Sequence, residues 1–145
     1  MKPSQPNVEY CIKHREFVNG LLEKKGGWQE GDRCAGRLGG SPPLVARVNN
    51  GKAYHVSTEG SCKGTFWSTG NWGDAWLPSV DDVLAMLTEA MDGRRDWMLE
   101  HIHNLDGTPR DYLAMLYPKG NKPMIGIGST PLIALLELLR VVSDA

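Results

Sequence analysis

The 145-residue sequence has no excess of either charge, with sixteen Lys and Arg against seventeen Asp and Glu. This balance excludes the electrostatic footprint of a nucleic-acid-binding protein, and equally that of an acidic DNA mimic. No apolar run approaches the roughly 18 residues of a membrane span, and the N-terminus lacks the order of a signal peptide. The three cysteines are an odd number for a disulfide framework. We therefore expect reduced thiols in a cytoplasmic protein.

Hydrophobic residues make up 41% of the chain and charged residues 23%, as in ordinary soluble globular proteins. The length suits one domain with its own core, so we predict a single domain over residues 1–145. Glycine and proline are concentrated in residues 26–78, which are expected to be rich in loops and hairpins. Residues 79–145 are expected to form a helix, strands and a second helix.

Three segments have the apolar spacing of helices: residues 5–25, 80–92 and 131–143. The face of the second is expected to consist of Val80, Val83, Leu84, Leu87 and Met91, with Ser79 as its N-cap. Apolar residues surround most of the third helix, so it is predicted to lie at the centre of the core. Ser129 or Thr130 caps that helix, and Leu135, Leu136 and Leu139 should be buried.

Short strands are predicted between the segments rich in glycine and proline. Residues 44–48 and 53–57 form a hairpin around Asn49-Asn50-Gly51, whose residues tolerate a positive φ. Residues 64–68 are a third strand or an ordered loop. Residues 97–103 and 112–117 pair across a turn, and 124–127 follow them. These elements predict an α+β fold with an antiparallel sheet packed against helices.

Two clusters have metal-ligating residue types. Cys11 and His14 lie three residues apart and form a tetrahedral zinc site only if Cys34 and Cys62 join them. Only one compact ligand pair is present, so buried, unreactive thiols are the favoured interpretation. The second cluster consists of His101 and His103, which lie two residues apart on a predicted strand, with His55 as a third possible ligand. A solvent-facing histidine pair is favoured there, and we predict no metal and no cofactor.

No motif of covalent catalysis is present. The chain has no G-x-S-x-G elbow and no cysteine in a recognisable protease context. Residues 126–130, Gly-Ile-Gly-Ser-Thr, can present backbone N–H groups to an anion at a helix start. They lack the lysine of a phosphate-binding loop, and a capped strand-to-helix turn explains them equally well. We predict no catalytic residue and favour a protein that is not an enzyme.

Residues 67–76 hold three of the five tryptophans. Tryptophan provides a large contact area with few rotors to order, which suits base stacking or a protein contact. The alternative is that these rings form a small core in a half with few aliphatic residues, with Trp76 its foremost member. Arginines that can meet phosphates or carboxylates precede this segment in the sequence: Arg33, Arg37 and Arg47.

Two stretches resemble small uncharacterised proteins encoded by phages and prophages of Firmicutes. They are residues 27–32, Gly-Trp-Gln-Glu-Gly-Asp, and residues 76–87, where Trp-Leu-Pro precedes an amphipathic helix. The C-terminal order of strands, Ser-Thr-Pro and a leucine-rich helix is similar to phage domains described as an ABA sandwich. The resemblance implies a phage gene acting in an infected bacterial host and an α/β/α sandwich-like fold, but no mechanism.

Three functions remain open on this basis. The first is a counter-defence protein that sequesters a small nucleotide-derived immune signal without catalysis. The others are an inhibitor that binds a host defence protein, such as a CRISPR nuclease, and a small phosphodiesterase-like enzyme that degrades the signal. An apolar last helix and a tryptophan-rich loop also favour a homodimer or higher oligomer. The ligand-binding residues predicted for the first function are Trp67, Trp72, Arg33, Arg37, Arg47, Ser129 and Thr130.

Overall fold

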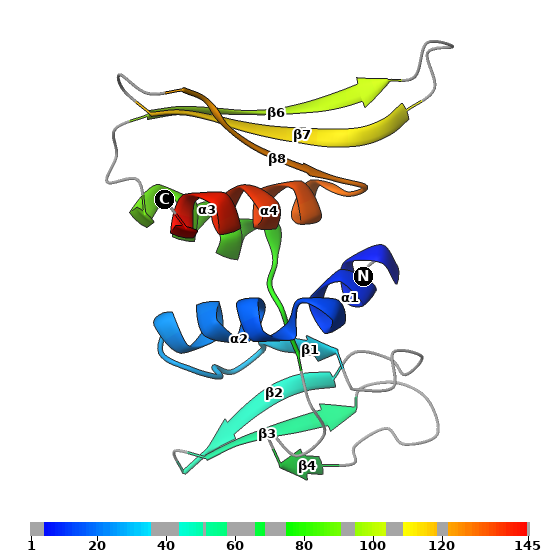
Figure 1. Cartoon of the computed structure of the whole chain (residues 1–145). Coiled ribbons are helices and arrows are strands. Elements are labelled where there is room, and N and C mark those ends of the chain that lie inside the picture. The colour runs from blue at the N-terminus through cyan, green and yellow to red at the C-terminus, as the bar shows by residue number, and fades with distance from the viewer. Residues whose placement is uncertain are drawn as a thin grey trace. The chain divides into compact units, whose positions relative to one another are not determined.

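The computed structural model describes residues 5–35, 44–50, 52–57, 66–68, 75–90, 95–103, 109–118 and 122–144. Within these ranges it describes the backbone alone for residues 35, 44, 57, 66–68, 95–103, 109–110, 117–118 and 144. The chain divides into two compact units, residues 1–78 and 79–145. Both combine helices with an antiparallel sheet (Figure 1), which confirms the predicted α+β class. The single-domain organisation stays a prediction, because each unit is described by itself.

The first unit contains two helices and a five-stranded sheet of order β4-β3-β2-β1-β5. Helices α1 and α2 lie over one face of this sheet (Figure 1). On that face Cys34, Ala46, His55 and Trp76 are fully buried. The elements are α1 (Gln5–Lys13), α2 (Arg15–Lys24), β1 (Arg33–Ala35), β2 (Leu44–Asn49), β3 (Lys52–Ser57), β4 (Phe66–Ser68) and β5 (Ala75–Leu77).

The predicted helix over residues 5–25 is interrupted at His14, which has φ −110° and ψ 38°. The backbone hydrogen bonds continue on both sides, because the His14 N–H donates to the Tyr10 carbonyl and the His14 carbonyl accepts from Val18. The rings of Tyr10 and His14 are 4.4 Å apart at this point. The interruption is thus a local bend accompanied by a ring contact, and neither proline nor glycine marks it in the sequence.

The predicted β2–β3 hairpin is confirmed, with Leu44 opposite Ser57 and Val48 opposite Ala53. Asn50 adopts φ +52° in its turn, a conformation that Asn tolerates better than most residues. Strand β4 confirms the strand alternative for the third segment. Strands β1 and β5 were not predicted; they pair with each other, with Cys34 opposite Trp76.

The second unit consists of α3 (Val80–Ala90), β6 (Arg95–His103), β7 (Pro109–Pro118), β8 (Met124–Gly128) and α4 (Pro131–Asp144). Its three strands follow the order β6-β7-β8, all antiparallel. Helices α3 and α4 cover one face of this sheet (Figure 1). Ala114 and Leu116 of β7 are buried there.

Helix α4 is the centre of this core, as predicted. Leu135 and Leu136 are fully buried and Leu139 is 2% exposed. Most of the apolar surface of this helix is therefore already covered within the chain, so it does not support the oligomer expected from it. None of the helices in the described ranges is long and apolar enough to cross a membrane.

Helix α3 begins as predicted at Ser79. The Ser79 Oγ accepts from the Asp82 N–H at 3.1 Å, and the Ser79 N–H donates to the Asp82 carboxylate at 2.9 Å. In this reciprocal pair, the side-chain oxygen of each residue accepts the backbone N–H of the other, as in a capping box. Val83 and Leu87 form the buried face, but Val80 is 38% exposed. The expectation of a buried Val80 was wrong, because the first turn lies at the edge of the covered area; Met91 lies outside the described residues.

Candidate functional site

The exposed face of the first unit's sheet carries two of the predicted arginines. Side chains alternate between the two faces of a strand, and Ala46 and His55 are buried on the helix side. Arg47 and Tyr54, directly opposite each other in the register, therefore lie on the other face. Arg33 lies there too, because it pairs with Val45, two residues before Arg47.

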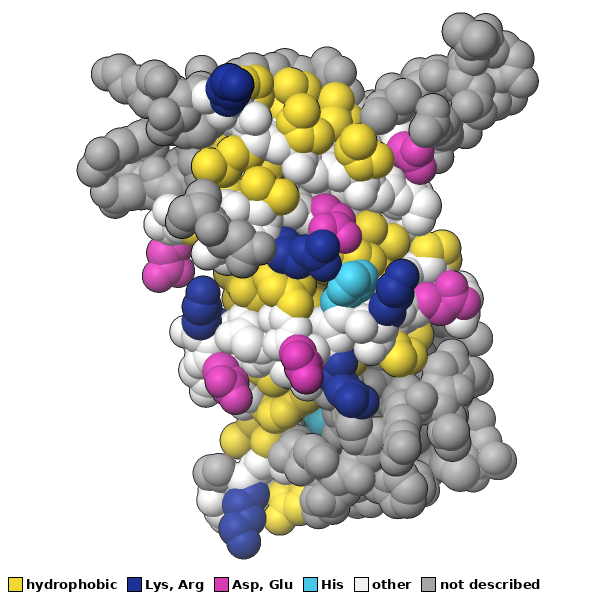
Figure 2. Space-filling model, viewed as in Figure 1, with side chains coloured by type: hydrophobic (Ala, Val, Ile, Leu, Met, Phe, Trp, Pro, Cys, Tyr) yellow, Lys and Arg dark blue, Asp and Glu magenta, His cyan; other side chains and the backbone are white. Residues whose placement is uncertain are grey.

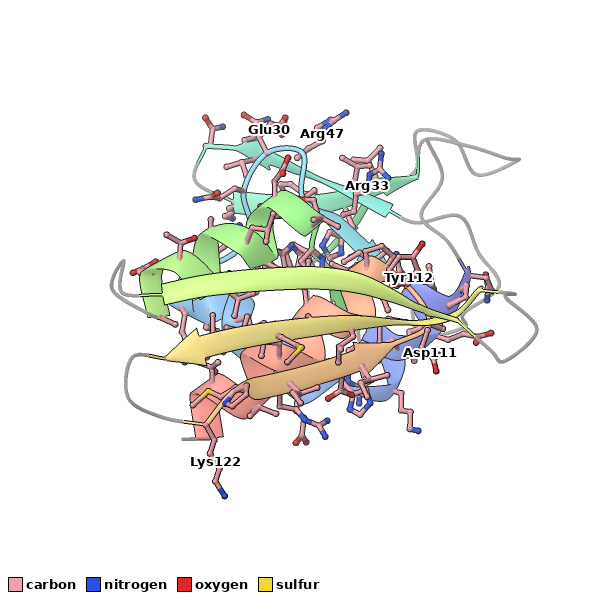
Figure 3. All side chains as sticks on the ribbon, turned by 90° about the horizontal axis from the view of Figure 1, so that it is seen from above. Glu30, Arg33, Arg47, Asp111, Tyr112 and Lys122 are labelled. Carbon is pink, nitrogen blue, oxygen red and sulfur yellow. The ribbon has the colours of Figure 1, made fainter. Side chains whose placement is uncertain are left out.

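We call Arg33, Arg47 and Tyr54 the arginine face. Both arginines are exposed and Tyr54 is half-buried. Arg33 and Arg47 stand diagonally across β1 and β2, a relation that separates Cβ atoms by about 7 Å. Figure 3 shows both side chains extending away from the sheet on the same side. The arrangement offers two guanidinium groups and a phenol ring to one ligand.

Glu30 is the acidic neighbour of this face. Its carboxylate lies 3.9 Å from the Arg47 Nε and accepts the Val48 N–H at 3.2 Å, and Figure 3 shows it beside Arg47. Both side chains of the ion pair are about half exposed, so solvent screening makes the pair weak. An anionic ligand can therefore replace Glu30 at Arg47 at little cost.

The turn before β1 fixes the position of Arg33. Lys25 Nζ donates to Asp32 Oδ2 at 2.7 Å and to the Gly27 carbonyl at 3.2 Å. Asp32 Oδ2 also accepts the Gln29 N–H at 2.8 Å, and Gly31 provides the φ of +89° that the turn requires. Because the Lys25–Asp32 pair is only about one-seventh exposed, it anchors the chain that leads into Arg33.

Lys25 also connects this turn to the interior. Its Nζ lies 5.3 Å from the centre of the Trp76 ring, within cation–π range. The Trp76 N–H of the backbone donates to Asn19 Oδ1 of α2 at 3.0 Å. Trp76 is fully buried, which confirms its predicted place in the core.

The predicted tryptophan platform is not assembled by the described residues. Trp72 and Arg37 lie outside them. Trp67 is described by its backbone alone, which pairs opposite His55. That pairing puts Trp67 in the row of Ala46 and His55, whereas Arg47 and Tyr54 belong to the alternate row.

His55 is enclosed on the helix side. Its ring meets that of Trp28 edge-on at a centroid distance of 4.4 Å, and it is fully buried. It therefore contributes to the packing on the helix side of the sheet and not to the arginine face. The side chains of His101 and His103 lie outside the described part of the chain, so the histidine cluster cannot be assembled from the residues that the structure describes.

Ser129 and Thr130 belong to the second unit and cap a helix. Thr130 Oγ1 accepts the Ile133 N–H at 3.2 Å, and the Thr130 carbonyl accepts from Ala134 at 3.0 Å. This decides the predicted cap in favour of Thr130. Ser129 is exposed, and neither residue belongs to the arginine face of the first unit.

The glycines before this cap have a packing role. A Cβ on Gly126 would collide with the backbone of Leu138 and Ala134, and one on Gly128 would collide with Ile133. The missing side chains let β8 lie directly against α4. The pattern that resembled an anion-binding loop is thus explained by a close strand–helix contact.

Two of the three cysteines are described; both are buried thiols that form no disulfide, as predicted. Burial raises the pKa of the Cys11 thiol from its ordinary value of 9.0 to about 12, because desolvation disfavours the thiolate. Cys62 lies outside the described residues. Among those described, no three His, Cys, Asp or Glu side chains are grouped as a metal site requires.

Sequence reasoning missed Tyr54 and Glu30. Tyr54 was accessible to it, since a hairpin closing at residues 49–51 with strands 44–48 and 53–57 already pairs Arg47 with Tyr54. No sequence pattern pointed to Glu30, because its contact with Arg47 depends on how the turn before β1 folds. Comparison with family models, with curated proteins and with solved structures finds no match.

Proposed function

We propose that this chain is a phage counter-defence protein that binds and sequesters a small nucleotide-derived signal on the arginine face, without chemical conversion. The observation that carries the binding part is the placement of Arg33 and Arg47 on one exposed face with Tyr54 directly opposite Arg47. The counter-defence part rests on the resemblance to phage proteins.

A nucleotide needs cations for its phosphates and a flat surface for its base. Guanidinium groups bind phosphate oxygens in a bidentate geometry, and Arg33 and Arg47 both reach solvent. A tyrosine ring stacks on any base, because every base has a π face. The exposed Glu30–Arg47 pair keeps Arg47 oriented until an anion replaces the carboxylate.

The direct test incubates the protein with cyclic dinucleotides and ADP-ribose derivatives, removes unbound ligand, and releases the bound fraction by heat. Recovery of intact ligand is the expected result. The Arg33→Ala/Arg47→Ala variant should lose the ligand, whereas Lys24→Ala, which removes an exposed cation elsewhere in the same unit, should retain it.

Other results would replace the proposal. Altered products would make the protein an enzyme that degrades the signal. Equal recovery from the wild type and the double variant would exclude the arginine face as the binding site. If no compound in the panel binds while one host defence protein does so directly, the protein is an inhibitor of that protein.

A further inference from the structure

The balanced charge of the whole chain conceals a difference between its two units. Residues 1–78 contain ten Lys and Arg against seven Asp and Glu, whereas residues 79–145 contain six against ten. The first unit therefore has a formal charge of +3 and the second a formal charge of −4. Such an asymmetry favours an anionic partner for the basic part of a chain. The basic unit is the one that contains the arginine face.

The strands of the arginine face concentrate this positive charge. Strands β1, β2 and β3 contain three Lys or Arg residues and no Asp or Glu. The third cation, Lys52, is exposed and lies two residues before Tyr54 on β3, so its side chain is on the same face as Tyr54 and Arg47. On the surface that Figure 2 presents, by contrast, Lys and Arg side chains are interspersed with Asp and Glu.

The three cations lie on one line across the sheet. Arg33 is the diagonal neighbour of Arg47, because its direct partner is Val45. Lys52 is in turn the diagonal neighbour of Arg47, whose direct partner is Tyr54. Both diagonals step toward the β2–β3 turn, and each step is about 7 Å. We call Arg33, Arg47 and Lys52 the cation diagonal.

This spacing distinguishes between classes of nucleotide. Neighbouring phosphorus atoms of a linear strand are joined by six covalent bonds, twice the three bonds that separate neighbouring Cα atoms by about 3.8 Å, so an extended strand places them about 7 Å apart. A pyrophosphate joins its phosphorus atoms through only two bonds, and a cyclic dinucleotide has only two phosphates. Three successive phosphates of a linear strand therefore match the cation diagonal best.

We propose that the arginine face, extended by Lys52, binds a linear single-stranded oligonucleotide, with one of three successive phosphates at each cation of the diagonal and a base on Tyr54. The proposal rests on the proposed function and narrows the small nucleotide-derived signal to this class. Val45 and Val56 pair with each other on the same face, where both are half-buried. They offer apolar contact to a base beside the ring of Tyr54.

The first test is calorimetric titration of the full-length protein with linear 5′-phosphorylated adenylates of one to four nucleotides. Exposed charge contacts are individually weak, so the affinity should rise by about threefold with each phosphate up to the third. The fourth nucleotide should add little. Cyclic diadenylate and ADP-ribose, titrated in the same way, should bind more weakly than the trinucleotide.

The second test isolates Lys52. Lys52→Gln removes the charge and keeps most of the side chain, so it should weaken trinucleotide binding by about threefold. Lys52→Arg keeps the charge and should bind like the wild type. Lys24→Gln is the matched control, because Lys24 is an exposed cation on α2, which covers the opposite face of the sheet. This control variant should also bind like the wild type.

The salt dependence of binding counts the contacts. The slope of log K against log salt concentration is about −0.7 for each phosphate that a single strand has neutralised. Lys52→Gln should lose one such step, whereas Lys24→Gln should keep the slope of the wild type. A merely structural effect of the Lys52 substitution would lower the affinity and leave the slope unchanged.

The outcomes separate this inference from the proposed function. The inference is overturned if cyclic diadenylate or ADP-ribose binds as tightly as the trinucleotide, or if Lys52→Gln retains the affinity and the slope of the wild type. In either case the proposed function stands as long as the Arg33→Ala/Arg47→Ala variant loses the bound nucleotide. If none of these compounds binds, both proposals are wrong.

Discussion

Arg47 and Tyr54 stand directly opposite each other on the β2–β3 hairpin, on the face away from the buried Ala46 and His55. The cross-strand pair unites a guanidinium group with an aromatic ring, two groups that recognise different parts of a nucleotide. The register of the β2–β3 hairpin sets this pairing.

The ring of Tyr54 should matter more than its hydroxyl for ligand binding. Tyr54→Ala removes a stacking surface worth about 1–3 kcal/mol per base, and is expected to weaken binding about tenfold or more. Tyr54→Phe keeps the ring and should retain most of the affinity. Isothermal titration with the best-bound compound of the panel measures both variants. Tyr54→Ala with wild-type affinity would show that the base does not stack there.

Gly126→Ala should destabilise the protein by about 1–3 kcal/mol, as expected of overpacking in a core. The added Cβ meets the backbone of Leu138 and Ala134, which belong to a rigid helix and have little room to move. Gly20→Ala is the control, because nothing lies within 4 Å of its added Cβ and alanine favours a helix interior. Urea unfolding should show a gain of about 0.5–1 kcal/mol for Gly20→Ala; a comparable gain for Gly126→Ala would contradict the close packing of β8 on α4.

Thr130 separates a capping role from a ligand-binding role. Loss of its Oγ1, which accepts the Ile133 N–H, should lower the free energy of unfolding by about 1 kcal/mol in Thr130→Ala. Thr130→Ser keeps the acceptor and should remain close to the wild type. Neither change should alter ligand affinity. A loss of binding by Thr130→Ala with unchanged stability would restore this residue to the site.

The Cys11 thiol gives stability a dependence on alkaline pH. Its pKa is raised from 9.0 to about 12 in the folded state by burial, so the folded protein holds the proton more tightly than the unfolded chain. The contribution of the buried, protonated thiol to the free energy of unfolding is complete below pH 9, and it is lost as the pH rises from 9 toward 12. Urea midpoints at pH 8 and 10.5 should therefore differ more in the wild type than in Cys11→Ala. Equal differences would place the Cys11 thiol in water.

Much of the local structure was predictable because short-range rules set it. Asn50 permits the hairpin turn, Ser79 and Thr130 satisfy helix N-termini, and the leucines of α4 recur at helical spacing. Each of these signals involves residues within a few positions of one another. The pairing of Arg47 with Tyr54 also follows from the hairpin alone.

Other features depend on partners far along the chain. Strands β1 and β5 have three residues each, too few to show alternation, and they exist through pairing between Cys34 and Trp76, forty-two positions apart in sequence. The bend at His14 has no local breaker. Glu30 reaches Arg47 only because the turn held by Lys25 and Asp32 directs the chain toward β2.

By itself, the sequence determined the α+β class, the Ser79 cap and the hairpin, because those depend on propensities and on neighbours one to four residues away. Only the tertiary structure decided which side chains share a face. Arg33 lies beside Arg47 because of a β1–β2 register that no local pattern specifies. Strand β8 packs closely on α4 because Gly126 and Gly128 have no side chains. The two isoleucines between and beside these glycines face away from the helices for the same reason: alternate side chains of a strand point to opposite faces, and the packing of α4 selects which face is covered.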